Sequence, residues 1–120
     1  MAGTCVYIRA SDHRVMVANA LSRAMGVRVG LRLEEGGYPA PAAEMICKAV
    51  TWVVENRRAL TIQRPLPGGL EGEGRMGQAR YIPHLLAGTV LGVFAEWRAL
   101  TADEFAQEPT PQIGVLSPAG

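Results

Sequence analysis

Residues 50–58 read Val50-Thr51-Trp52-Val53-Val54-Glu55-Asn56-Arg57-Arg58, and the expected fold is worked out from this segment. Its first five residues are all β-branched or aromatic, which favours a strand that ends near Glu55. Pro41 suits the first turn of a helix, so we expect a short helix over residues 42–48 ahead of the strand. Another strand is expected over residues 59–63. These elements predict mixed α and β structure.

The N-terminal third adds three expected elements. Residues 4–10 alternate in side-chain character and predict a strand. Apolar residues recur every four positions over residues 12–25 and Gly26 follows them, which indicates a helix that ends at a glycine. Apolar and polar residues then alternate over residues 27–33, which predicts a half-buried strand with arginines on its wet face.

The C-terminal half is expected to contain a long loop and one further buried strand. Residues 65–80 hold five glycines and two prolines, so they predict an exposed loop. Residues 89–97 are largely apolar and predict a buried strand. Capping-box spacing from Thr101 predicts a short helix, and residues 108–120 are expected to form a flexible tail. Residues 1–107 would then be a single α+β domain.

The composition limits the classes of protein to which this chain can belong. The 120 residues are 48% hydrophobic, which suits one domain with a single core. Cys5 and Cys47 are too few for a disulfide framework, and we expect both to be reduced and buried. His13 and His84 are not spaced as zinc ligands, so neither a metal nor a cofactor is expected. No segment reaches the roughly 20 apolar residues of a membrane span, and we expect a cytoplasmic protein.

Three side chains near residues 50–58 are candidates for catalysis. Lys48, Thr51 and Glu55 would meet at one end of the sheet, where a desolvated lysine beside a carboxylate can act as a general base. The alternative is an ordinary surface ion pair with solvated neighbours. Arg57 lies two residues after Glu55, so in a strand their side chains would share a face and would line a functional cleft.

Four segments keep the order of motifs found in a known family: Pro41-Ala42-Ala43-Glu44-Met45-Ile46, Val54-Glu55-Asn56-Arg57, Ala59-Leu60-Thr61-Ile62-Gln63 and Ala87-Gly88-Thr89-Val90-Leu91-Gly92-Val93. On these segments, residues 38–105 resemble the ASCH family of the PUA-like superfamily. The family pattern G-x-K-x-x-E-x-R is incomplete here. Trp52 stands where the pattern has its lysine, and the only lysine, Lys48, lies seven residues before Glu55.

The resemblance implies an α+β fold with a small mixed or antiparallel, barrel-like sheet flanked by two or three short helices. It also implies a cleft that accepts RNA, a nucleotide or a modified base. In some family members a Lys/Thr/Glu set hydrolyses an acylated cytidine, which is the role that the three candidate catalytic residues would take.

Three functions are consistent with these observations. The leading hypothesis is a small nucleic-acid or nucleotide-binding domain, in which Arg57 and Arg58 contact phosphate while Tyr38 or Trp52 offers a stacking face. Eleven of the twelve cations are arginine, which suits bidentate contact with phosphate. The alternative is a protein–protein regulator or inhibitor without catalytic activity, and a second alternative is a small amidohydrolase acting on a modified nucleoside. Whether the protein is an enzyme stays open.

Overall fold

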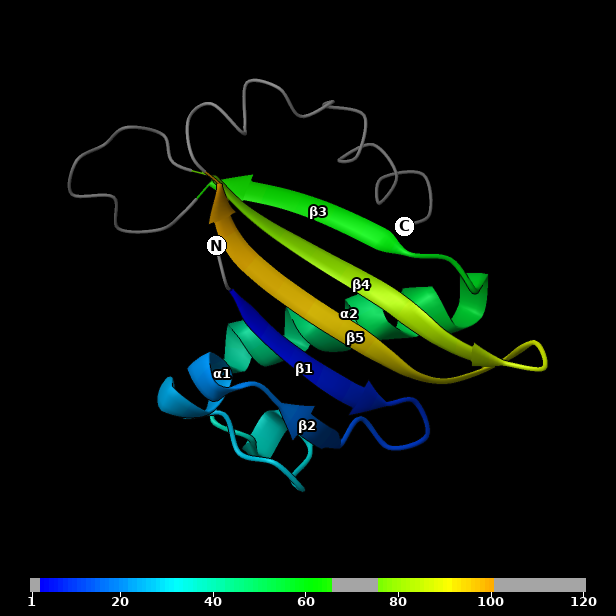
Figure 1. Ribbon diagram of the computed structural model, residues 1–120, viewed down its shortest axis with the longest axis horizontal. Coiled ribbons are helices and arrows are strands. Elements are labelled where there is room, and N and C mark those ends of the chain that lie inside the picture. The colour runs from blue at the N-terminus through cyan, green and yellow to red at the C-terminus, as the bar shows by residue number, and fades with distance from the viewer. Residues whose placement is uncertain (1–2, 66–75, 101–120) are drawn as a thin grey trace.

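One antiparallel sheet of five strands organises the computed structural model, which describes residues 3–65 and 76–100 (Figure 1). The strands lie in the order β2-β1-β5-β4-β3. They are β1 (Thr4–Arg9), β2 (Val15–Ala18), β3 (Leu60–Pro65), β4 (Met76–Leu86) and β5 (Thr89–Leu100). Because β2 and β3 form two separate edges, the sheet is open and the expected barrel-like closure is wrong. The α+β class and the antiparallel pairing are confirmed.

The β4–β5 hairpin provides the two longest strands of the sheet. Its turn places Ala87 and Gly88 at φ values of 52° and 81°, the left-handed region that reverses a chain tightly. β1 pairs along the other side of β5, so β5 is the central strand. The strands expected over residues 4–10, 59–63 and 89–97 are therefore confirmed.

The loop expected over residues 65–80 is wrong in its described C-terminal part. Residues 76–80 belong to β4, which pairs with β3 on one side and with β5 on the other. Pairing on both sides satisfies the backbone there, and this outweighs the low strand propensity of residues such as Gly77. The helix expected from Thr101 and the tail over residues 108–120 lie outside the described residues.

A single long helix, α2 (Ala40–Asn56), lies against one face of the sheet (Figure 1). It contains residues 50–54, so the strand expected there is wrong. Its buried residues recur at helical spacing and form one stripe: Ala43, Ile46, Ala49, Val50, Trp52 and Val53. Burial of this stripe outweighs the modest cost of β-branched residues in a helix. The helix ends at Arg57, which takes the left-handed conformation with φ 55°.

The helix expected over residues 12–25 is replaced by the strand β2 and the short helix α1 (Ala20–Ala24). Asn19 separates the two elements. Its Oδ1 accepts a hydrogen bond from the Ser22 amide at 3.0 Å, which caps α1, and one from the Cys5 amide at 3.2 Å. Pairing with β1 therefore extends a stretch whose apolar spacing alone favoured a helix.

The strand expected over residues 27–33 is also wrong. Gly26 and Gly30 take φ values of 102° and 93°, which do not occur in a regular strand. The chain turns instead and enters a single turn of 3₁₀ helix, η1 (Leu33–Glu35), where Leu33 is fully buried. Of the alternating apolar residues of this stretch, Leu33 is the one that is fully buried, and the segment that carries it is irregular.

Two glycines let the chain cross itself between α1 and α2. Gly37 takes φ 97°, and a Cβ atom placed on it would overlap the carbonyl oxygen of Gly26. Beside this crossing the amide of Arg28 donates to the carbonyl oxygen of Gly36 at 2.9 Å. Residues 25–38, here named the connecting segment, are therefore held in place by contacts between backbone atoms.

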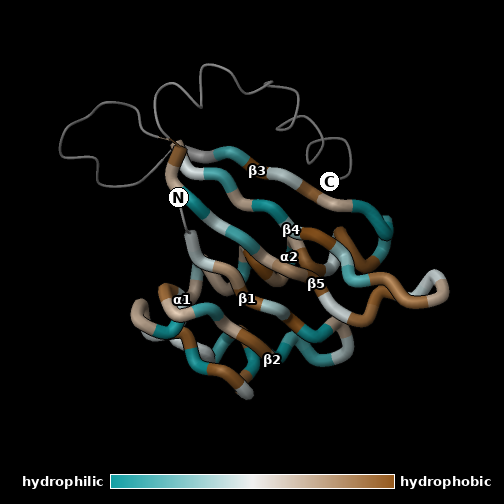
Figure 2. Tube along the Cα trace, in the orientation of Figure 1, coloured by the Kyte–Doolittle hydropathy of each residue, from teal (hydrophilic) through white to brown (hydrophobic). Residues whose placement is uncertain are grey.

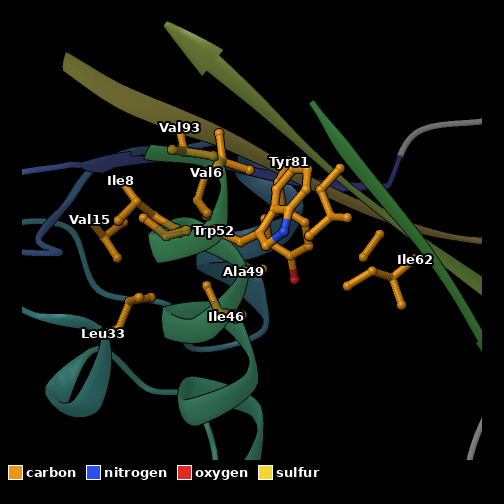
Figure 3. Packing of buried hydrophobic residues seen from close by; sticks show 14 of the residues in the cluster. Val6, Ile8, Val15, Leu33, Ile46, Ala49, Trp52, Ile62, Tyr81 and Val93 are labelled. Atoms are coloured by element: carbon orange, nitrogen blue, oxygen red, sulfur yellow. The ribbon is translucent and has the colours of Figure 1, made fainter. Parts of the chain in front are cut away.

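The hydrophobic core lies between α2 and the face of the sheet that it covers, here called the inner face (Figure 3). From the sheet, β1 contributes Val6 and Ile8, β5 contributes Val93 and β4 contributes Tyr81. Figure 3 shows Trp52 projecting from α2 toward the strands near Tyr81. Burial of each large aliphatic or aromatic side chain contributes about 1.5–3 kcal/mol, so the core as a whole supplies a large favourable contribution to folding.

Cys5 and Cys47 are free thiols, but both are half-buried and not fully buried as expected. Burial raises the pKa of both thiols, and the carboxylate of Glu96 raises that of Cys5 further. A raised pKa leaves less thiolate at neutral pH, so neither cysteine has the environment of an activated nucleophile.

We expect Gly37→Ala to destabilise the protein more than Gly30→Ala does. Both glycines have a positive φ, which costs an alanine about 1 kcal/mol, but open space surrounds Gly30 whereas the backbone of Gly26 faces Gly37. Urea unfolding gives the free energy of unfolding of each variant, and the difference between the two measures the cost of moving the backbone of Gly26 away from residue 37. Equal unfolding midpoints would contradict the crossing as a structural constraint.

Asp12 gives a prediction on pH dependence. It accepts two hydrogen bonds from Arg9, at 3.0 and 2.7 Å, and one from the amide of Arg14, and the hydrogen bonding to Arg9 holds the pKa of Asp12 well below its usual range. In the unfolded chain the pKa of an aspartate is about 3.9. Because the pKa of Asp12 is lower in the folded protein, its ionised carboxylate stabilises the fold above about pH 3.9, and this stabilisation is lost as the pH falls toward the folded-state pKa.

We therefore expect Asp12→Asn to be less stable than the parent near neutral pH, with a difference that shrinks steadily below about pH 4. Urea unfolding across this pH range measures it. A stability difference that does not change with pH would show that the charge of Asp12 makes no contribution.

Candidate functional site

Lys48, Thr51 and Glu55, the candidate catalytic residues, lie on the exposed face of α2. Their spacing of three and four residues brings them to one side of the helix. Lys48 Nζ lies 3.7 Å from Oε2 of Glu44, and the two side chains are 78% and 70% exposed. Such an exposed pair contributes little energy, and none of the three candidates lines the cavity described below.

Glu55 and Arg57 do not project together from a strand, because α2 ends between them. The guanidinium carbon of Arg58 lies 5.8 Å from the centre of the Trp52 ring. Trp52 is 8% exposed, so its ring packs in the core and is not a free face for stacking. Of the four residues expected to bind a ligand, Tyr38 lines the cavity described next, and Arg57, Arg58 and Trp52 do not.

A cavity of about 290 Å³ lies between the inner face of the sheet and the N-terminal half of α2. We call it the sheet–helix cavity. It is lined by residues of β1, β4, β5, the connecting segment and α2: Thr4, Val6, Met25, Val27, Gly37, Tyr38, Ala42, Met45, Ile46, Ala79, Tyr81, Ala95, Glu96 and Trp97. The register explains the sheet side, since Val6 and Tyr81 both pair with Ala95 and their side chains therefore share the inner face.

The polar groups of the sheet–helix cavity are few. Burial raises the pKa of Tyr38, so its phenol stays protonated and able to donate a hydrogen bond. Glu96 is the one charged residue among the described lining residues, but it pairs with Arg80 on the opposite face of the sheet, where its carboxylate lies 3.9 Å from the Arg80 guanidinium. Both side chains of that pair are about half exposed, at 43% and 53%, which places this charge toward solvent.

The described lining contains few groups that take part in acid–base or nucleophilic chemistry. It contains neither an imidazole nor a thiol, and Glu96 is its one carboxylate. In the part of the chain that the structure describes, no three His, Cys, Asp or Glu side chains gather as they would around a metal ion.

No helix within residues 3–65 and 76–100 has the length and apolar character to cross a membrane.

The opposite, outer face of the sheet exposes a second group of apolar side chains. Val17, Tyr7, Phe94 and Ile82 follow one another across four strands, and Val17 and Phe94 are 61% and 40% exposed. The Tyr7 hydroxyl and His84 Nδ1 are hydrogen-bonded at 2.7 Å. Figure 2 shows that apolar residues also gather at the hairpin end of β4 and β5.

Most of the cavity was missed at the level of sequence. Ala79 and Tyr81 lie at the start of β4, part of which was expected to be a loop, and Trp97 lies at the end of the expected final strand. Two signals were present: Tyr81 follows Ala79 by two residues, and Ala95 precedes Trp97 by two, the spacing of side chains on one strand face. Only the pairing of β4 with β5 shows that these four residues lie together on one face of the sheet.

No protein-family model matches the chain, and no curated protein matches it. Solved structures do match. The PAS domain of BvgS from Bordetella pertussis superposes with a TM-score of 0.61 at 22% identity, over 98% of this chain and 89% of that one. A sensory box sensor histidine kinase from Vibrio cholerae gives a TM-score of 0.67 at 15% identity, over 84% and 81%. VqmA bound to DPO gives 0.65 at 17%, over 89% of this chain and 56% of that one.

These likenesses correct the family resemblance drawn from short motifs. None of the matched structures described above is an ASCH or PUA-like protein, and the open sheet with its order β2-β1-β5-β4-β3 is not a barrel. The hypotheses of a nucleic-acid or nucleotide-binding domain and of a nucleoside amidohydrolase depended on that resemblance and are set aside with it. In its fold, the chain is similar to a PAS domain.

Proposed function

We propose that this domain is a signal-receiving module that binds a small molecule in the sheet–helix cavity and regulates another protein without catalysing a reaction. One observation carries the proposal: an apolar cavity of about 290 Å³ with few, well-separated polar groups lies beside the core. Concave, mostly apolar cavities of this kind are the usual binding sites for small molecules. The alternative of a non-catalytic regulator, drawn from the sequence, is retained in this form.

The similar structures support the proposal by analogy of fold. One is named as a sensory box sensor histidine kinase, and another is VqmA bound to DPO. A shared fold does not by itself assign a function, so the weight of the argument lies on the cavity.

The position of the cavity offers a physical route from a bound ligand to the surface. Ala95 and Trp97 of β5 line the cavity, whereas Phe94 belongs to the exposed outer face. A ligand that shifts β5 would therefore move side chains on both faces of the sheet. The ligand biases such a shift only if it contacts the two arrangements differently.

Filling the cavity tests the proposal. Ala79→Leu adds apolar volume from the inner face of β4, and Ala59→Leu, at an exposed position outside the lining, is the matched control. Thermal unfolding is followed with a library of small organic compounds. At tenfold excess over its Kd, a ligand stabilises the folded state by about 1.4 kcal/mol, which raises the Tm by several degrees.

We expect some compounds to raise the Tm of the parent and of Ala59→Leu but not that of Ala79→Leu. The proposal fails if no compound stabilises the parent, or if Ala79→Leu responds as the parent does. Circular dichroism of each variant without ligand confirms that the fold is retained.

A further inference from the structure

We infer that the ligand of the sheet–helix cavity is an uncharged aromatic molecule of about ten non-hydrogen atoms that accepts a hydrogen bond from the hydroxyl of Tyr38. The inference rests on the proposed function and narrows it to one chemical class. Four properties of the lining support it: its volume, its charge, one polar atom and its aromatic rings.

The volume sets the size of the ligand. A water molecule occupies about 30 Å³ in the liquid, so a cavity of about 290 Å³ holds a molecule of about ten non-hydrogen atoms. This is the lower end of the range for small-molecule sites.

The described lining offers no charged partner to an ionic ligand. Glu96 is the one charged residue among the described lining residues, but it pairs with Arg80 on the outer face of the sheet, so its carboxylate points away from the cavity. A ligand carboxylate or phosphate would therefore find no cation there, and a ligand ammonium would find no carboxylate. The apolar remainder of the lining would also strip water from any ion. An uncharged ligand avoids each of these costs.

Tyr38 supplies the specific polar contact. Its side chain lines the cavity, and no hydrogen bond joins its hydroxyl to another residue of the described chain. The phenol is protonated at neutral pH, and burial raises the pKa of Tyr38 further above neutrality. A ligand that brings a carbonyl oxygen or a ring nitrogen to this hydroxyl would therefore form a hydrogen bond that no described residue makes.

Aromatic rings and thioethers make up much of the remaining lining. Tyr38, Tyr81 and Trp97 are the aromatic residues of the described lining, and Met25 and Met45 are its methionines. Aromatic pairs gain energy beyond their buried area, and sulfur packs favourably against ring edges. A planar aromatic ligand would use these contacts better than an aliphatic molecule of the same size.

Matched probes of nearly equal size test the class. Acetophenone is neutral and aromatic with an acceptor, benzoate is an anion, phenethylammonium is a cation, cyclohexyl methyl ketone lacks the ring and ethylbenzene lacks the acceptor. Binding is measured by isothermal titration calorimetry and by ligand-observed NMR on the full chain, with Ala79→Leu as the test that binding occurs in the cavity. We expect acetophenone to bind most tightly, and at least tenfold more tightly than either ion.

Tyr38→Phe separates the hydrogen bond from the packing, because the ring is kept and only the hydroxyl is lost. We expect this variant to bind acetophenone about tenfold more weakly and to bind ethylbenzene as the parent does. Equal effects on both probes would assign Tyr38 a packing role only and would overturn this part of the inference.

The remaining outcomes separate the inference from the proposed function. If benzoate or phenethylammonium binds as tightly as acetophenone and Ala79→Leu abolishes that binding, the ligand class is wrong while the signal-receiving function stands. If library compounds bind in the cavity but none of the aromatic probes does, the class is likewise wrong. If nothing binds there, both the class and the proposed function fail.

Discussion

The buried stripe of α2 packs against the inner face of the sheet, and this contact positions the sheet–helix cavity. Toward the C-terminal end of the helix, large residues such as Trp52 and Val53 complete the core. Toward the N-terminal end, Ala42, Met45 and Ile46 line the cavity, and residues of the connecting segment form another of its walls. Since protein interiors are otherwise close-packed, an apolar hollow at this place is a departure that suggests a binding site.

The connecting segment is the least regular wall of the cavity, and backbone contacts hold it. The crossing of Gly26 and Gly37 brings two stretches of chain closer than side chains would allow. Tyr38 follows this crossing directly and reaches the cavity from it. Tyr38 is thus carried by a largely irregular segment whose course is fixed by backbone hydrogen bonds, such as that from the Arg28 amide to the Gly36 carbonyl oxygen.

The resemblance to the ASCH family shows how short motifs can mislead. Its central piece, Val54 to Arg57, was interpreted as the end of a strand, but it spans the last turn and the C-cap of α2. Lys48, Thr51 and Glu55 consequently lie on a solvated helix face instead of at the edge of a sheet. A short run of apolar β-branched residues is compatible with a buried strand or with a buried helix, and periodicity alone cannot separate the two.

The sequence by itself predicted mixed α and β structure and the strands over residues 4–10, 59–63 and 89–97, which the structure contains. It also singled out Tyr38, which lines the cavity and whose binding role stays a prediction. The predicted strands depend on the local order of apolar and polar residues, which can be read from the sequence alone. Only the tertiary structure decided that residues 50–54 are helical, that residues 76–80 pair in β4, and that an apolar cavity forms beside them. Each of these outcomes depends on burial or hydrogen bonding against segments distant in sequence, and such contacts override local propensity.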